Sequence, residues 1–126
     1  MRRIATLVVA CFVTLSALAD YKGELDQQQA LDKIKAGKIA VIDVRTPEEF
    51  AEGHVPGAIN IPYDKIGERL SEIPAKKDQP VLLYCHSGRR SAMAETTLTA
   101  AGYSSLYHLK GDMQAWVENR RPVEKK

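Results

Sequence analysis

The stretch Val81–Ser91 reads VLLYCHSGRRS and decides the fold class of this chain of 126 residues. Its first four residues are a continuous apolar run, which is typical of a strand covered on both faces of a sheet. The cysteine follows at once, and Gly88 lets the backbone bend before a helix that we expect over Ser91–Ala101. A strand, a short loop and a helix in this order predict one unit of a parallel α/β sheet.

Apolar runs and helical patterns alternate along the rest of the chain in the same way. Thr46 and Glu49 form a capping box with a proline at the first helical position, and Gly53 ends that helix. Asp26 can cap an earlier helix, and Asp64 opens a later one. Further strands are expected over 39–42, 58–61 and 105–109, and further helices over 27–36, 47–52, 64–73 and 112–118. The alternation predicts a parallel sheet with helices on both faces.

The start of the chain has a different pattern. Two arginines precede an almost uncharged apolar run over Ile4–Leu18, and Ala17-Leu18-Ala19 is an A-x-A cleavage signal. We therefore expect residues 1–19 to be a signal peptide that is cleaved on export. The mature chain would begin at Asp20 and would be periplasmic or otherwise exported.

Two alternatives exist for this segment. A membrane anchor is one, but the apolar run is shorter than the about 20 residues of a spanning helix. A lipoprotein signal is the other, because Val8-Val9-Ala10-Cys11 loosely resembles the box that precedes a lipidated cysteine. Cleavage before Cys11 would leave a very short apolar segment and would not explain Phe12–Leu18. A cleaved signal peptide accounts for the whole segment.

Composition places the remainder of the chain among globular proteins. Hydrophobic residues make up 44% of the sequence and charged residues 27%, which favours one packed domain over disorder. We expect this domain over 20–126, with a short charged tail over about 119–126. Loss of Arg2 and Arg3 would leave 16 Lys and Arg against 16 Asp and Glu. A net charge of zero argues against nucleic acid as a partner, and no membrane association is expected after cleavage.

Cys85 would be the only cysteine of the mature chain, because Cys11 lies in the signal segment. It cannot form an internal disulfide there, so it is a buried bystander, half of an intermolecular bridge, or a reactive thiol. Its position favours the last of these. In a parallel sheet ligands bind beyond the carboxyl ends of the strands, and Cys85 directly follows one.

The loop after Cys85 has the features of an anion-binding cradle. Backbone N–H groups and the positive end of the following helix dipole point toward its centre, and Arg89 and Arg90 add positive charge. Gly88 allows the backbone to bend without a side chain in the way. We expect the thiolate of Cys85 to be stabilised here, although a strand-end cysteine can also serve as a small core residue.

Three groups of residues resemble the rhodanese family. The loop Cys85–Ser91 is similar to the family's C-x-x-G-x-R motif followed by serine. A second match reads IDVR at 42–45, EF at 49–50 and GHVPGAINIP at 53–62. The C-terminal part of the family pattern is matched by Gly102, Tyr103, Leu109, Gly111 and Trp116. The resemblance covers about Leu25–Trp116.

This resemblance implies a three-layer α/β/α domain with a five-stranded parallel sheet and an active-site loop that starts at the cysteine. In the family the cysteine attacks the outer sulfur of a donor such as thiosulfate, sulfite leaves, and the persulfide passes its sulfur to cyanide or a thiol. N–H groups and an arginine would stabilise both the dianionic donor and the leaving sulfite. The implied partners are a small-molecule sulfur donor and a thiophilic acceptor, or a protein acceptor. We expect a monomer without a cofactor.

The resemblance and the position of the loop assign roles to its residues. Cys85 and Arg90 are the expected catalytic residues. The expected substrate-binding residues are His86, Ser87, Gly88 and Arg89. His86 stands where many relatives carry arginine, so the preferred donor is open, and its ring could tune the sulfur or face solvent.

Other polar residues have weaker signals. Asp43 and Arg45 lie at another strand end and are expected to support the site through an ion pair or loop hydrogen bonds. His54 is expected to be structural, and three histidines with one cysteine give no metal site. Asp112 stands where a second glycine is common in the family, and we expect only a changed loop or a helix cap there.

Two other functions compete with sulfur transfer to small molecules. Some relatives of this fold are phosphatases, but they place arginine six positions after the cysteine, whereas Arg90 is at the fifth and Ser91 at the sixth. The second rival is a persulfide carrier or redox-sensing module without enzymatic turnover. It would use the same Cys85 persulfide.

Overall fold

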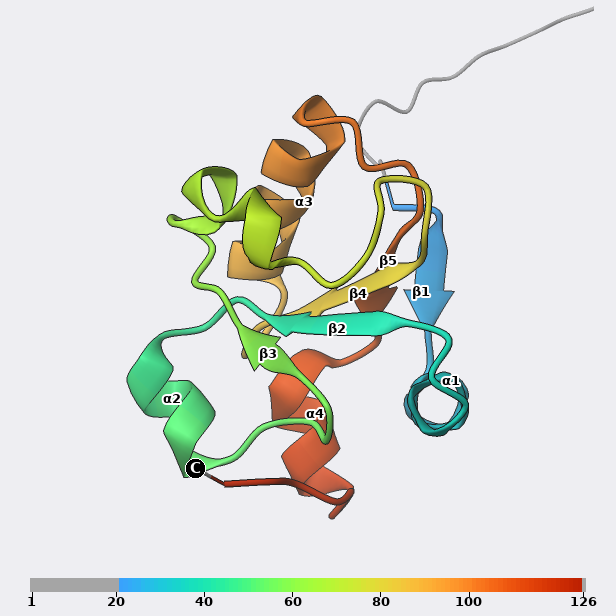
Figure 1. Cartoon of the computed structure of the whole chain (residues 1–126). Coiled ribbons are helices and arrows are strands. Elements are labelled where there is room, and N and C mark those ends of the chain that lie inside the picture. The colour runs from blue at the N-terminus through green and yellow to red at the C-terminus, as the bar shows by residue number, and fades with distance from the viewer. Residues whose placement is uncertain (1–20, 126) are drawn as a thin grey trace, which may run out of the picture.

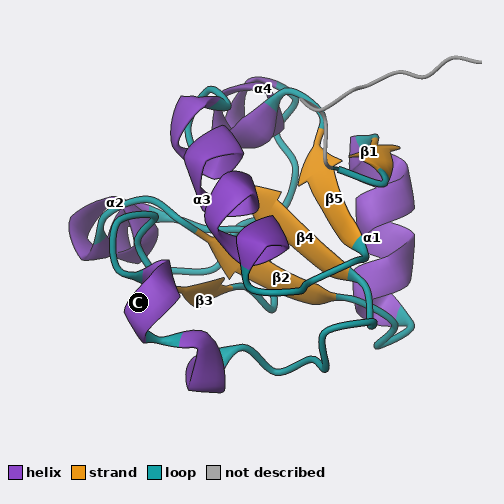
Figure 2. Ribbon diagram, turned by 90° about the horizontal axis from the view of Figure 1, so that it is seen from above, coloured by secondary structure: helices purple, strands orange, loops and turns teal. Residues whose placement is uncertain are grey.

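The computed structural model describes residues 21–125, in which one five-stranded parallel sheet lies between two layers of helices (Figure 1; Figure 2). The strands are β1 (Gly23–Leu25), β2 (Ala40–Asp43), β3 (Ile59–Asn60), β4 (Val81–Tyr84) and β5 (Leu106–Leu109). Their order across the sheet is β1-β5-β4-β2-β3, and every neighbouring pair is parallel. The expected three-layer α/β/α fold is confirmed.

Helices cover both faces of the sheet, as the alternation in the sequence predicts. They are α1 (Gln27–Lys35), α2 (Pro47–Glu52), α3 (Arg89–Ala100) and α4 (Asp112–Glu118), with two short 3₁₀ helices, η1 (Ile66–Glu68) and η2 (Leu70–Glu72). Figure 1 shows α3 and the 3₁₀ helices on one side of the sheet, and α1, α2 and α4 on the other. The capping boxes expected at Asp26 and Thr46 are both present.

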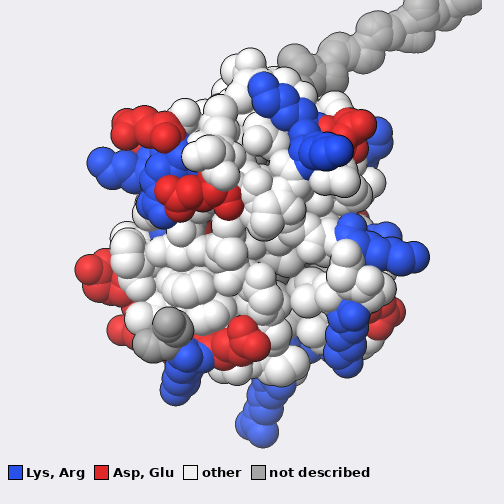
Figure 3. All heavy atoms as spheres, in the orientation of Figure 1, with Lys and Arg blue, Asp and Glu red and all other residues white. Residues whose placement is uncertain are grey.

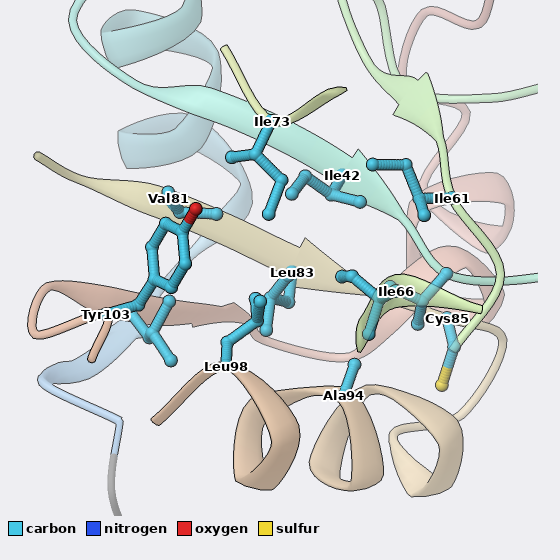
Figure 4. Packing of buried hydrophobic residues seen from close by; sticks show 12 residues of the cluster. Ile42, Ile61, Ile66, Ile73, Val81, Leu83, Cys85, Ala94, Leu98 and Tyr103 are labelled. Carbon is cyan, nitrogen blue, oxygen red and sulfur yellow. The ribbon is translucent and has the colours of Figure 1, made fainter. Parts of the chain in front are cut away.

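Strand β4 lies in the middle of the sheet, between β2 and β5. All four of its residues are completely buried, as the apolar run predicts. Because side chains alternate along a strand, Val81 and Leu83 pack toward α3, while Leu82 and Tyr84 pack into the second core on the other face. The same alternation directs Cys85 into the α3 layer, where Figure 4 shows it at the end of the cluster.

The prediction of an α-helix over 64–73 is wrong, because the chain forms η1 and η2 there instead. In these two helices, backbone N–H groups donate to the carbonyl three residues back, as from Arg69 to Ile66 and from Ile73 to Leu70. A 3₁₀ turn rises about 2.0 Å per residue instead of 1.5 Å, so the segment spans more of the α3 layer. Ile66 and Ile73 are both buried in that core.

Strand β1 has no counterpart among the strands expected from local pattern. It has three residues, of which Leu25 alone is fully buried, and this is too short to show an alternation. Its pairing with β5, in which Glu24 lies opposite His108, makes it an edge strand. This strand brings the sheet to the five strands that the family resemblance implies.

The charged C-terminal segment lies against the domain. Glu124 pairs with His54 through two backbone hydrogen bonds of 2.9 Å. The indole N–H of the buried Trp116 donates to the carbonyl of Pro122 at 2.8 Å. His54 is also stacked on Phe50 with ring centroids 3.6 Å apart, so its expected structural role is confirmed.

The surface carries charges of both signs. On the face in Figure 3, lysines and arginines are interspersed with aspartates and glutamates around a largely uncharged centre. No helix within residues 21–125 has the length and apolar character needed to cross a membrane. The expected signal peptide over 1–19 lies outside the described residues.

Candidate active site

Cys85 lies directly after β4, with its sulfur beside the first turn of α3 (Figure 4). The residue is 1% exposed. Two backbone N–H groups point at the sulfur, from Gly88 at 3.1 Å and from Ser91 at 3.3 Å. The expected cradle of N–H groups at the carboxyl end of a strand is therefore present, and it surrounds the sulfur itself.

Ser91 is a further member of this cradle. Its hydroxyl lies 3.7 Å from the Cys85 sulfur and donates a hydrogen bond to the Gly88 carbonyl at 3.0 Å. The serine is part of the family motif, but it was not predicted to be a substrate-binding residue. Its place in the first turn of α3 turns its backbone N–H toward the sulfur.

Gly88 is required at its position for two reasons. Its φ of 109° lies in the left-handed region that favours glycine. A Cβ atom there would also lie 3.2 Å from a carboxylate oxygen of Asp112. The expected role of this glycine in bending the loop is thus confirmed. The other predicted substrate-binding residues of the loop, His86, Ser87 and Arg89, are exposed.

Arg90 faces a carboxylate on the neighbouring helix α2. Its guanidinium makes two hydrogen bonds to Glu49, of 2.7 and 3.0 Å, and the side chains are 26% and 33% exposed. These bonds lower the pKa of Glu49 to about 2, although burial opposes the shift and a backbone bond from Thr46 adds to it. Arg90 therefore connects the loop to α2. The sequence placed Glu49 in a capping box and in a family motif, but did not predict its contact with the loop.

Asp43 and Arg45 form the buried ion pair that was expected. The Arg45 side chain donates to Asp43 from Nη2 at 2.7 Å and from Nε at 2.9 Å, and it also donates to the carbonyl of Gly53 at 2.8 Å. The Tyr84 hydroxyl donates to Asp43 at 2.7 Å and accepts the Val55 N–H at 3.0 Å. The pair thus braces the ends of β2 and β4 next to the loop.

An open cleft of about 590 Å³ lies beside the loop, between α2, α4 and the C-terminal segment. His86 lines it from the loop and Arg45 from the end of β2. Met113, Gln114 and Val117 of α4 line the opposite side. The cleft is large enough to hold an organic molecule or a peptide segment next to His86.

Asp112 contacts the loop from behind, which the sequence did not predict. Its carboxylate accepts the Cys85 N–H at 3.0 Å, and the side chain also contacts Nε2 of His108 at 2.9 Å. The residue is 2% exposed and has a φ of 55°. The helix cap, one of the two expected alternatives, is wrong, because the N-cap of α4 is Gly111 and Asp112 turns its carboxylate toward the ends of β4 and β5. A loop changed from the family pattern stays a prediction.

The sequence of this chain is similar to those of known proteins. A profile of the Rhodanese-like domain family matches residues 26–119. A protein named sulfurtransferase from Allochromatium vinosum is 40% identical over 85 residues, covering 68% of this chain and 78% of the other. Thiosulfate sulfurtransferase 16, chloroplastic, from Arabidopsis thaliana is 37% identical over 94 residues, covering 66% and 78%.

A solved structure has the same fold. The crystal structure of a rhodanese-related protein from Thermoplasma volcanium matches with a TM-score of 0.70 at 28% identity, covering 82% of this chain and 98% of the other. The profile match includes strands β2 to β5, the loop that starts at Cys85 and the buried Asp43–Arg45 pair. This chain therefore belongs to the rhodanese-like domain family.

Proposed function

We propose that this protein is a sulfurtransferase that carries a sulfane sulfur as a persulfide on Cys85. The donor is thiosulfate or a similar anion, and the acceptor is cyanide or a thiol. The observation that carries this proposal is the pair of N–H groups, from Gly88 and Ser91, directed at the Cys85 sulfur at the carboxyl end of β4. The names of the sulfurtransferase relatives support sulfur transfer as the general activity.

In the first half of the reaction, the Cys85 thiolate attacks the outer sulfur of thiosulfate. A new S–S bond forms to Cys85 while the bond within thiosulfate breaks, and sulfite leaves with the electron pair of the broken bond. The N–H groups of Gly88 and Ser91 stabilise the anionic sulfur at the centre of the loop. The product is a Cys85 persulfide.

In the second half, a thiophile attacks the outer sulfur of the persulfide. The S–S bond to Cys85 breaks, and its electron pair returns to the cysteine, which becomes a thiolate again. Cyanide becomes thiocyanate in this step, and a thiol becomes a persulfide. The cleft lined by His86 gives a thiol on a larger molecule, including a protein, a place to approach the loop.

The purified protein should form thiocyanate from thiosulfate and cyanide, and this assay tests the proposal. Cys85→Ala should form none, because no other cysteine lies within the domain. Thiocyanate formation by Cys85→Ala would require another nucleophile. Formation of a Cys85 persulfide without turnover would instead assign the chain to the carriers, and hydrolysis of a phosphate ester would assign it to the phosphatases.

We also propose that residues 1–19 are cleaved on export, which rests on the arginines and the A-x-A signal of the sequence. The intact mass of the secreted protein should correspond to a chain that begins at Asp20. Ala19→Phe should block cleavage, because the site needs a small residue at that position. Retention of residues 1–19 in the secreted wild type, or a lipid on Cys11, would contradict this proposal.

A further inference from the structure

A row of titratable side chains runs from the sheet edge to the back of the active-site loop. Glu24 on β1 contacts Nδ1 of His108 on β5 at 3.0 Å. Nε2 of the same imidazole contacts the Asp112 carboxylate at 2.9 Å, and that carboxylate accepts the Cys85 N–H at 3.0 Å. These contacts connect three segments that are distant in sequence, and Cys85 lies at the end of the row.

The contacts around His108 favour its doubly protonated state. Both ring nitrogens face carboxylate oxygens, and a carboxylate can accept a hydrogen bond but cannot donate one. A neutral imidazole has one N–H, so one of these contacts would bring two acceptors together. An imidazolium has two N–H groups and satisfies both.

The groups that face His108 support its positive charge. Burial opposes that charge, but the hydrogen bond and charge of Asp112, followed by those of Glu24, outweigh it and raise the pKa of His108 above its ordinary value. Tyr21 stacks on the ring with centroids 5.3 Å apart, and burial raises the pKa of Tyr21, so it stays neutral. Its hydroxyl donates to the Ser91 carbonyl at 3.0 Å.

The positive charge of His108 affects the active-site loop through Asp112, which contacts both His108 and the Cys85 N–H. Its side chain is 3% exposed, and a buried carboxylate is costly unless a cation or several hydrogen bonds compensate it. One of its oxygens is the atom that a Cβ on Gly88 would approach at 3.2 Å, and the Gly88 N–H points at the Cys85 sulfur. An uncompensated negative charge here would repel an anionic donor and the thiolate itself.

We propose that His108, held as an imidazolium between Glu24 and Asp112, is a positioning residue for Cys85. It fixes the Asp112 carboxylate on the Cys85 N–H and cancels its negative charge beside the loop that receives the anionic sulfur donor. This inference rests on the proposed reaction of Cys85 with such a donor. Sulfur transfer from anionic donors therefore becomes slower when His108 loses its proton, whereas attack on a neutral electrophile is affected less.

Two alkylating agents of similar size measure the charge at Cys85 without any sulfur transfer. Iodoacetate is an anion and iodoacetamide is neutral, so the ratio of their rates with Cys85 cancels the ionisation of the thiol. In the wild type this ratio should fall by about threefold to tenfold as His108 loses its proton, since one unit charge acts across a few ångströms of partly solvated protein. His86→Gln should keep this pH dependence, which separates the two histidines.

Two variants distinguish charge compensation from a purely structural role. His108→Gln should give a low ratio without the pH dependence that His108 causes, because the Asp112 carboxylate has lost its cationic partner. His108→Gln combined with Asp112→Asn should restore the ratio, because the amide oxygen of asparagine still accepts the Cys85 N–H but carries no charge. A ratio in the double variant as low as in His108→Gln, or a wild-type ratio that is independent of pH, would overturn the proposal.

A measurement on the wild type does not depend on how the variants fold. Nitrogen chemical shifts of ¹⁵N-histidine-labelled protein should show both ring nitrogens of His108 protonated at pH 7. A neutral His108 at this pH would contradict the inference. Absence of thiosulfate turnover would contradict the proposed function alone, since the alkylation ratio and the nitrogen shifts still report the charge state of His108.

Discussion

Backbone N–H groups make the shortest hydrogen bonds to the Cys85 sulfur. From the sequence, the arginines of the loop were expected to add positive charge beside it. The N–H groups of Gly88 and Ser91 point at the sulfur, whereas Arg90 makes two hydrogen bonds to Glu49. Arg90 can therefore act on an anion through its charge and by holding the loop against α2. Its importance for turnover stays a prediction.

We predict that Arg90→Ala lowers kcat/KM with thiosulfate by about tenfold to hundredfold. A charge-assisted hydrogen bond is worth about 1.5 to 3 kcal/mol, and the alanine would also leave the Glu49 carboxylate uncompensated beside the loop. Arg90→Lys should recover only part of the loss, because it keeps the charge without the planar fork. Steady-state kinetics of the purified variants measure the effect.

Arg69 offers a matched control for this prediction. It forms a similar two-bond pair with Glu72, of 2.7 and 2.8 Å, in the 3₁₀ region outside the loop. Arg69→Ala should leave kcat/KM unchanged. If Arg90→Ala also left kcat/KM and the pH profile of Cys85 alkylation unchanged, the prediction would be wrong. The backbone and Arg89 would then bind the anion.

The raised pKa of His108 also predicts a pH dependence of stability. A histidine whose pKa is higher in the folded state stabilises that state fully below its unfolded pKa of about 6.5, and this contribution is lost as the pH rises through the folded pKa. The difference in free energy of unfolding between the wild type and His108→Gln should thus be constant in mild acid and shrink toward alkaline pH. Urea unfolding at several pH values would show this. A difference that grows with pH would mean that the shift has the opposite sign.

At the scale of the elements, local patterns were sufficient where the signal lies within one segment. The apolar run of β4, the capping boxes at Asp26 and Thr46 and the glycine of the loop were all predictable, because each depends on neighbouring residues. Strand β1 was not, since its pairing with β5 joins residues far apart in the chain. The two 3₁₀ helices differ from the expected α-helix because packing against α3 overrode the local pattern.

The same distinction applies to the site. Cys85, Gly88 and the Asp43–Arg45 pair were found from motifs and their place at strand ends. Asp112 lies 27 residues after Cys85, and its contact with the Cys85 N–H depends on how β4 and β5 pair. The spacing of four residues between His108 and Asp112 could have drawn attention to them, but this spacing crosses the end of a strand and therefore did not indicate a contact.

Tyr84 on β4 connects the active-site edge of the sheet with the second core. Tyr84→Phe should lower the free energy of unfolding by about 1 to 3 kcal/mol, because the buried Asp43 carboxylate and the Val55 N–H would each lose a hydrogen-bond partner. Tyr107→Phe, at a partly exposed position on the neighbouring β5, is the control and should change stability much less. Equal effects of the two substitutions in urea unfolding would show that the buried hydroxyl has no special role.

At the scale of the whole molecule, the parallel sheet gathers the functional residues at one edge. The carboxyl end of β2 leads to Arg45, that of β4 to Cys85, and that of β5 to Asp112. Parallel strands place these ends side by side, so residues from three distant parts of the sequence surround one loop. Helices α3 and α4 begin at the same edge, and the backbone N–H of Met113 donates to the carbonyl of Cys85 at 2.9 Å.

The central claim is that Cys85 carries the transferred sulfur, and the intact mass of the protein after brief treatment with thiosulfate tests it most directly. The wild type should gain about 32 Da, the mass of one sulfur atom. Digestion should locate this gain on the peptide that contains Cys85. Cyanide should then remove this mass with release of thiocyanate, and Cys85→Ala should show no gain. An unchanged mass of the wild type, or the same gain in Cys85→Ala, would contradict a persulfide on Cys85.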